Sequence, residues 1–255
     1  MPRTARSLRL APLLLALWGV AVASPPAPAP DPAVAPASAP ASAPTSAPAS
    51  AAAAAAPTTC TYRTYSWSVK TKKAVGHSQV AKAYAEVTDD ERDPADPRCT
   101  VCQEDQVAVA VPGLPPVTVC RHWAPQVEAA LQAVHTGGAF TIERLDGYRP
   151  GRTRGAVKDH LRTAWSNHSF GTAIDINAHH NGLYNPCKLS DPPTTAAQIA
   201  HCRKGMGGAW NPQARPKLTI VPGGEVHTAF TAFWKWGGAL PGNLKDFMHF
   251  SITGE

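Results

Sequence analysis

Two stretches of the chain place apolar residues three or four positions apart, which is the spacing of an amphipathic helix. In residues 124–138 the apolar positions that share one face are Val127, Ala130, Leu131 and Val134. In residues 225–238 they are Val226, Phe230, Phe233 and Trp234. Pro125 suits the first turn of the first stretch, and a pair of glycines closes each stretch. The pattern therefore predicts two helices.

Four further stretches predict strands, within 107–119, 140–150, 171–177 and 246–252. The first stretch predicts two strands around a Pro-Gly turn. In 171–177, Ile174 and Ile176 share one face with Thr172, whereas Asp175 faces the other way with Ala173 and Asn177. In 246–252, Met248, Phe250 and Ile252 point toward a core, so His249 faces the opposite side with Phe247 and Ser251.

The order of these elements indicates the fold class. Residues 60–122 predict short strands and turns, and no internal repeat is visible. Because strands and helices are mixed without regular βαβ alternation, we expect an α+β fold.

The N-terminal 57 residues differ in composition from the rest. Residues 1–23 carry three arginines before an apolar run that is shorter than the roughly 20 residues of a membrane span. They predict a signal peptide that is cleaved near Ala23, and hence export to the periplasm or the extracellular space. Residues 24–57 are almost wholly Pro, Ala and Ser, which predicts a disordered, semi-rigid linker. No cysteine stands directly after the cleavage site as a lipid-attachment point, so we expect no stable membrane anchor.

The charge of the chain excludes one class of partner. Three of its 24 basic residues leave with the signal peptide, so 21 basic residues remain against 18 acidic ones, a formal charge of +3. This weak excess allows attraction to an anionic cell wall, but it is no footprint of a nucleic-acid-binding protein. We expect a monomer that does not bind nucleic acid.

Six cysteines remain in an exported chain, which favours disulfides. Six cysteines allow fifteen pairings, and we expect Cys187 to pair with Cys202 across the insert between them. The pairing of the other four stays open at this point. The alternative for "CTVC" at 99–102 is a zinc knuckle, although only one such motif is present.

The segment "SNHSFGTAIDI" (166–176) concentrates candidate chemistry. Gly171 allows a tight bend that brings His168 back toward Asp175, and His249 lies on the last predicted strand. Two histidines and a carboxylate, with a fourth position left for water, are the ligand set of a catalytic zinc site. The alternatives are packed or solvated histidines, or ligation by His179 and His180 instead.

A second, non-ligating carboxylate near such a site can accept a proton. Asp246 is the candidate, but it lies three residues before His249 and would face the opposite side of a straight strand. It shares the site only if it precedes that strand, where "PGNLK" lets the chain turn.

Several motifs resemble a known family. "SNHSFGTAID" is similar to S-x-H-x-x-G-x-A-x-D, "DFMHF" is similar to [DE]-x-x-H-F with "WGG" shortly before it, and "LDGYRPG" resembles an earlier "SGYR" element. These motifs occur in the zinc D-alanyl-D-alanine carboxypeptidases and the related L-alanyl-D-glutamate endopeptidases, whose fold is shared with the hedgehog signalling domain. The likeness runs from about residue 120 to 252, and Asp in "DFMH" is more like the endopeptidases.

The resemblance implies a role for seven residues. One Zn²⁺ ion would be bound by His168, Asp175 and His249, with Asp246 as the general base. Arg149 would polarise the scissile carbonyl or bind a substrate carboxylate, Ser166 would hydrogen-bond the substrate, and Trp236 would line the cleft. The alternatives for the last three are a surface salt bridge, a turn cap and core packing, respectively.

The function that we expect from this likeness is hydrolysis of peptidoglycan stem peptides by a secreted zinc metallopeptidase. Residues 58–119 would form a disulfide-containing N-terminal extension, and residues 120–255 would form the zinc peptidase core domain. Whether the enzyme is a D,D-carboxypeptidase or an L-Ala–D-Glu endopeptidase stays open. The alternative functions are a non-catalytic zinc-containing module that binds cell wall or protein, and a disulfide-rich envelope protein whose histidines are incidental.

Overall fold

The computed structural model describes residues 56–255, so the predicted signal peptide and nearly all of the predicted linker lie outside the described residues. The described residues form part of one compact unit. Helices are few and the sheets are almost wholly antiparallel, which agrees with the predicted α+β class.

A central four-stranded sheet has the strand order β11-β13-β8-β5. Its strands are β5 (Leu145–Asp146), β8 (Ala173–Ile176), β11 (Lys235–Trp236) and β13 (His249–Ser251). The register pairs Asp175 with His249 on one side and with Asp146 on the other. Because Ile174, Ile176 and Phe250 are fully buried, this register is specified by the core beneath the sheet.

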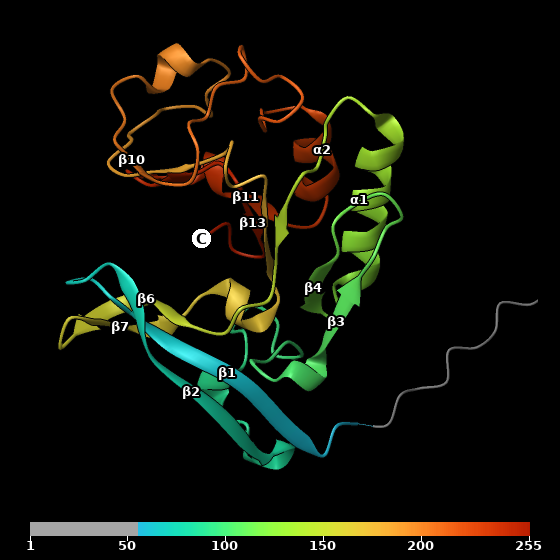
Figure 1. Cartoon of the computed structure of the whole chain (residues 1–255), viewed down its shortest axis with the longest axis vertical. Coiled ribbons are helices and arrows are strands. Elements are labelled where there is room, and N and C mark those ends of the chain that lie inside the picture. The colour runs from blue at the N-terminus through green and yellow to red at the C-terminus, as the bar shows by residue number, and fades with distance from the viewer. Residues whose placement is uncertain (1–55) are drawn as a thin grey trace, which may run out of the picture. The chain divides into compact units, whose positions relative to one another are not determined.

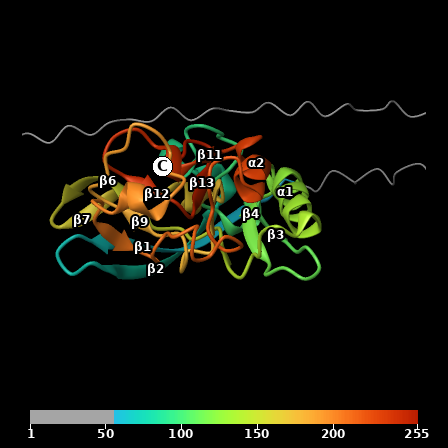
Figure 2. The same ribbon diagram turned by 90° about the horizontal axis from the view of Figure 1, so that it is seen from above.

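Two helices, α1 (Ala124–Gly137) and α2 (Glu225–Thr231), lie side by side next to β11 and β13, as Figures 1 and 2 show. The first helix agrees with its prediction, and Gly138 ends it in a left-handed conformation (φ 71°). The second helix is shorter than predicted. It ends at Thr231 because Lys235 and Trp236 pair with the edge of the central sheet as β11 instead of continuing the helix.

A second four-stranded sheet has the order β2-β1-β6-β7 and crosses the lower part of Figure 1. Its strands are β1 (Thr59–Ser68), β2 (Lys73–Ala83), β6 (Arg152–Lys158) and β7 (Leu161–Trp165). The sequence predicted only short strands in this region, because most positions of β2 are polar or exposed and show no apolar alternation. This sheet therefore combines β1 and β2, from the predicted extension, with β6 and β7, from the predicted core domain.

The remaining strands are β3 (Gln106–Val109), β4 (Val117–Cys120), β9 (Leu183–Tyr184), β10 (Lys204–Met206) and β12 (Lys245–Asp246). The β3–β4 hairpin confirms the two strands predicted around the Pro-Gly turn. In contrast, only Leu145–Asp146 of the strand predicted over 140–150 is a strand.

The prediction of one strand over 246–252 is wrong. Residues 245–246 belong to β12 and pair with β9, whereas residues 249–251 form β13 in the central sheet. Phe247 lies between the two strands, is fully buried, and stacks on Trp210 with ring centroids 4.7 Å apart. Phe247 therefore belongs to the core and does not share the face of His249, and the chain changes direction around it.

Three disulfides involve all six cysteines: Cys60–Cys102, Cys99–Cys120 and Cys187–Cys202. The predicted Cys187–Cys202 pair is confirmed. The two cysteines of "CTVC" bind different partners, so the zinc-knuckle alternative is wrong. These disulfides suit an extracellular or periplasmic protein. Among residues 56–255, no helix has both the length and the apolar character that crossing a membrane requires.

The Cys60–Cys102 disulfide should hold the β1–β2 hairpin on the rest of the molecule, because it closes a loop of 42 residues next to the start of β1. Replacing both cysteines with Ala should lower the free energy of unfolding by about 2–4 kcal/mol. It should also speed amide hydrogen exchange in β1 and β2. The double Ala variant of Cys187 and Cys202 is the control, and unchanged hairpin exchange in the first variant would contradict the assignment.

Candidate metal centre

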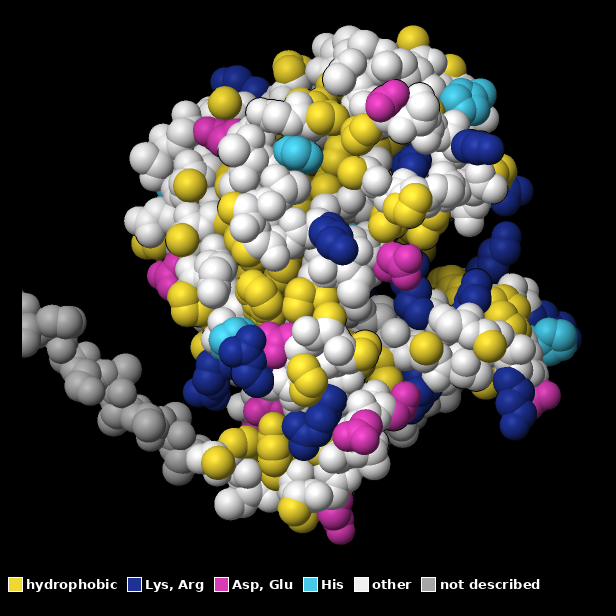
Figure 3. Space-filling model, turned by 180° about the vertical axis from the view of Figure 1, so that it is seen from behind, with side chains coloured by type: hydrophobic (Ala, Val, Ile, Leu, Met, Phe, Trp, Pro, Cys, Tyr) yellow, Lys and Arg dark blue, Asp and Glu magenta, His cyan; other side chains and the backbone are white. Residues whose placement is uncertain are grey.

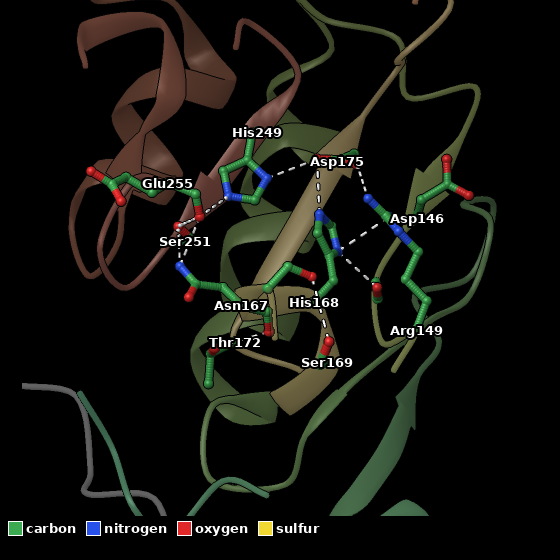
Figure 4. Close-up of polar contacts among 12 residues, drawn as sticks. Asp146, Arg149, Asn167, His168, Ser169, Thr172, Asp175, His249, Ser251 and Glu255 are labelled. Atoms are coloured by element: carbon green, nitrogen blue, oxygen red, sulfur yellow. Dashed lines mark hydrogen bonds and ion pairs between the residues drawn. The ribbon is translucent and has the colours of Figure 1, made fainter. Parts of the chain in front are cut away.

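The three predicted ligands converge at the middle of the central sheet. Asp175 lies on β8, His249 lies opposite it on β13, and His168 lies in the short 3₁₀ helix Asn167–Phe170 that precedes β8. One oxygen of Asp175, Oδ1, is 3.1 Å from His168 Nε2 and 2.9 Å from His249 Nδ1. The three ligand atoms lie within 4.8 Å of one another, and all three residues are buried. Figure 4 shows the two rings facing the Asp175 carboxylate.

Gly171 makes the bend between His168 and Asp175. Its φ of 68° is the left-handed conformation that favours glycine. A Cβ atom there would lie 2.0 Å from Gln106 Oε1 and 2.4 Å from the backbone nitrogen of Cys120. No other residue type fits this position without displacing the chain, which explains the glycine in the motif.

The hydrogen bonds around the rings determine which nitrogen atoms carry lone pairs. His168 Nδ1 lies 2.8 Å from the carbonyl oxygen of Gly147, which only accepts, and 3.3 Å from Arg149 Nη1, which only donates. The shorter contact favours the proton on Nδ1 and the lone pair on Nε2. His249 Nε2 likewise donates to the main-chain oxygen of Glu255 at 3.0 Å, which leaves Nδ1 toward Asp175. His168 Nε2 is buried and has no hydrogen-bond partner among the described residues.

Three electron-pair donors thus point at one small space, and two imidazoles with one carboxylate are a ligand set that suits zinc. Each ring also donates its other N–H to a main-chain oxygen, the outer support that metal-ligating histidines commonly have. The residues present therefore fit a zinc ion.

The pKa shifts of the buried groups agree with this arrangement. Burial alone would raise the pKa of Asp175, but its contacts with His168 and His249 outweigh burial and hold that pKa well below its usual range. Burial lowers the pKa of His168, which favours the neutral imidazole that a metal ion would bind. An ionised carboxylate and a neutral imidazole are the protonation states that metal ligation requires.

Asp246 lies beside the centre because β12 ends there, before the chain turns into β13. The Cβ atoms of Asp246 and His249 both lie close to Gly237, and both side chains line the same pocket. Asp246 Oδ1 is buried and has no partner within residues 56–255. Burial raises the pKa of Asp246 to about 6.

The other predicted residues have different outcomes. Arg149 Nη2 donates to Asp175 Oδ2 at 2.9 Å, and its side chain, which is 44% exposed, lines the pocket. Ser166 lines the same pocket. Trp236 does not: it is 2% exposed and packs in the core, where its indole N–H donates to the carbonyl oxygen of Phe247. We therefore withdraw the expected role of Trp236 in substrate binding.

His179 and His180, the alternative ligands, lie elsewhere. Their Nε2 atoms approach Glu143 and not Asp175. The structure therefore favours His168, and not His179 or His180, as the histidine that joins Asp175 and His249 in this centre.

A pocket of about 380 Å³ opens onto the centre, and its walls come from both four-stranded sheets. The sequence did not indicate seven of its lining residues, which are Tyr65, Trp67, Thr153, Arg154, Leu183, Met206 and Met248. Tyr65 and Trp67 lie far from the motifs along the chain, and Met248, which the alternation placed toward the core, lines the pocket together with His249. Figure 3 shows a hollow in one face of the molecule, with Lys and Arg side chains on its rim.

Part of the chain is similar to a known protein family. Residues 160–252 match the family model of D-alanyl-D-alanine carboxypeptidases. No curated protein and no solved structure shows a significant match to the chain. The match confirms the resemblance stated from the motifs, and it supports a carboxypeptidase-like peptidase at the level of the family. Arg149 and the β1–β2 hairpin lie outside the matched residues.

The raised pKa of Asp246 predicts a stability effect in metal-free protein. The carboxyl titrates near pH 6 in the folded state and near 3.8 when unfolded, so the folded state binds more protons between these values. Stability therefore falls as the pH rises from about 4 to 6, and the full penalty remains above pH 6. Asp246→Asn should raise the free energy of unfolding at pH 7 by about 1–3 kcal/mol.

Thermal unfolding in the presence of a chelator measures this effect at pH 7 and at pH 4. The gain should be much smaller at pH 4, where the folded state binds the proton and the unfolded state binds it in part. If Asp246→Asn is less stable than the parent at pH 7, the folded state does not disfavour ionisation of Asp246, and the prediction is wrong.

Proposed function

We propose that this protein, whose residues 160–252 match the carboxypeptidase family, is an exported zinc metallopeptidase that cleaves peptidoglycan stem peptides at bonds involving D-amino acids. The observation that carries the proposal is the convergence of three lone-pair donors next to a buried carboxyl group that has no hydrogen-bond partner in the described part of the chain. We further infer the fold shared by these peptidases and the hedgehog signalling domain, supported by the ligands on two adjacent antiparallel strands.

In this proposal His168 Nε2, Asp175 Oδ1 and His249 Nδ1 hold the zinc ion. When bound by three protein ligands, zinc would act as a Lewis acid that lowers the pKa of a water molecule and polarises a carbonyl group. The main-chain oxygens of Gly147 and Glu255 hold the two rings in the tautomers that ligation needs.

Asp246 is the proposed general base. It takes a proton from the attacking water, whose oxygen forms the new bond to the amide carbon. As the carbon–nitrogen bond breaks, Asp246 returns the proton to the leaving amine. A pKa of about 6 suits both steps, since such a carboxyl group can accept and release a proton near neutral pH.

Arg149 and Ser166 are the proposed binding groups for the substrate. Arg149 is oriented by its ion pair with Asp175, and its remaining N–H groups can face the pocket. A guanidinium group there can stabilise negative charge on the carbonyl oxygen or bind a carboxylate of the substrate. Arg154 adds a second cation to the same pocket, which favours a substrate that carries carboxylates.

The shape of the pocket supports a peptide of several residues. A second pocket of about 550 Å³ shares Tyr65 and Arg149 with the first and continues along β1 to Arg63 and His77. A free dipeptide does not need this extension. The open, partly aromatic groove is therefore more favourable to cleavage within a stem peptide than to a closed site for a terminal residue.

A purely structural or binding role for the zinc ion is the competing function. It leaves Asp246 unexplained, because a buried carboxyl group without a hydrogen-bond partner lowers stability and contributes nothing to a metal that already has three ligands. This feature favours an enzyme.

Digestion of purified peptidoglycan tests the proposal. The zinc-loaded protein should release fragments, and a chelator should abolish the release. Asp246→Asn should lower kcat by about 10²–10⁴-fold, with zinc content unchanged. Asp191→Asn, at an exposed position of the 187–202 insert, is the matched control and should keep full activity.

Mass spectrometry of the fragments identifies the bond. Loss of a terminal D-alanine defines a D,D-carboxypeptidase, and a cut between L-Ala and D-Glu defines an endopeptidase. If Asp246→Asn and the parent release the same fragments at the same rate, the proposed mechanism is wrong. No release by a protein with bound zinc would favour the binding module.

The β1–β2 hairpin should contribute to substrate affinity. Trp67→Ala removes an aromatic wall of the pocket, so KM for a stem peptide should rise about tenfold, with zinc affinity unchanged. Val157→Ala, at an exposed position of β6 outside the pocket, is the control. Equal KM values for parent and Trp67→Ala would show that the hairpin does not contact the substrate.

A further inference from the structure

A second group of metal-ligating side chains lies apart from the candidate metal centre. Glu143 Oε2 is 2.6 Å from His179 Nε2 and 3.1 Å from His180 Nε2. One ligand atom from each residue lies within 4.8 Å of the other two. None of the three residues lines the pocket at the candidate metal centre, and the mechanism proposed above uses none of them.

The backbone around this cluster is held in place by Asn177, directly after β8. The side-chain oxygen of Asn177 accepts hydrogen bonds from the backbone N–H groups of Glu143 and Arg144, and its amide nitrogen donates to the carbonyl oxygen of Thr141. The backbone N–H of His180 in turn donates to the carbonyl oxygen of Asn177 at 2.8 Å. The segment before β5 and the turn after β8 are therefore tied together before any ligand binds.

We propose that Glu143, His179 and His180 form a second metal site, which binds a divalent transition-metal ion such as Zn²⁺. Two imidazole nitrogens and one carboxylate oxygen suit zinc, whereas Ca²⁺ and Mg²⁺ need more oxygen ligands than one carboxylate supplies. Ligands about 2.0–2.1 Å from a tetrahedral zinc ion lie roughly 3.3 Å from each other. The observed separations of 2.6 and 3.1 Å from Glu143 need only a small expansion to reach this value.

The degree of exposure is also suitable for an exchangeable ion. The side chains of Glu143 and His179 are 42% and 44% exposed, and that of His180 is 18% exposed. Solvent can therefore reach the ion and complete its coordination. The simpler explanation of the contacts is that both rings donate an N–H group to one carboxylate, and the two explanations differ in the number of zinc ions bound.

A metal ion at this site would connect the two segments that flank the paired strands β5 and β8. These strands carry Asp146 and Asp175, which lie side by side in Figure 4. Occupancy of the second site should therefore stabilise the strand pair on which the first centre depends, and it should raise the melting temperature at a fixed zinc concentration.

Isothermal titration of the untagged, metal-free protein with ZnCl₂ tests the inference. The parent should bind two equivalents, and His179→Asn/His180→Asn should bind one. Glu143→Gln, a conservative change at an exposed position, should weaken the second equivalent at least tenfold. The matched control, His135→Asn/His201→Asn, alters two exposed histidines outside the cluster and should bind two equivalents.

A further variant separates this inference from the proposed function. His168→Asn/His249→Asn should lose the first equivalent and all activity but should keep the equivalent that depends on Glu143. A parent that binds one equivalent, or a cluster variant that binds as many as the parent, would overturn the second site and leave the peptidase proposal intact.

Discussion

The pairing of β8 with β13 is the constraint on which the candidate site depends. It places Asp175 directly opposite His249, and a slip of one residue would turn one of the two side chains to the other face of the sheet. The buried side chains of Ile174, Ile176 and Phe250 oppose such a slip, because it would remove them from the core. The third ligand is then placed by a short bend at Gly171, which connects His168 to the same strand.

The site also contains groups that lower the stability of the fold. Asp246 is buried, has no hydrogen-bond partner among residues 56–255, and has a raised pKa. Such groups persist where the surrounding structure over-determines their position. Here Phe247 stacks on Trp210 directly beside Asp246, and the indole of Trp236 donates to the carbonyl oxygen of Phe247. The aromatic core thus holds the carboxyl group where the proposed reaction needs it.

The N-terminal hairpin belongs to the site as much as the matched segment does. β1 pairs with β6 and β7, and its Tyr65 and Trp67 line the pocket over the candidate metal centre. Residues 160–252 supply the ligands and Asp246, whereas Arg149 and the hairpin come from outside that segment. The family likeness therefore supports the proposed chemistry. Part of the groove that would select a substrate is formed by residues outside the matched segment.

Local patterns in the sequence were enough to predict the first helix, the β3–β4 hairpin, strand β8 and the Cys187–Cys202 disulfide, whereas the family resemblance was needed to choose the candidate ligand set. Each depends on residues that are close in sequence or, for the ligands, on motifs at a fixed spacing. The division of 246–252 into two strands, the core position of Trp236, the pairing of the other four cysteines and the β1–β2 wall of the pocket were decided by the tertiary structure. These features depend on contacts between distant residues, such as Phe247 with Trp210 or Cys60 with Cys102, and periodicity along the chain carries no information about such partners.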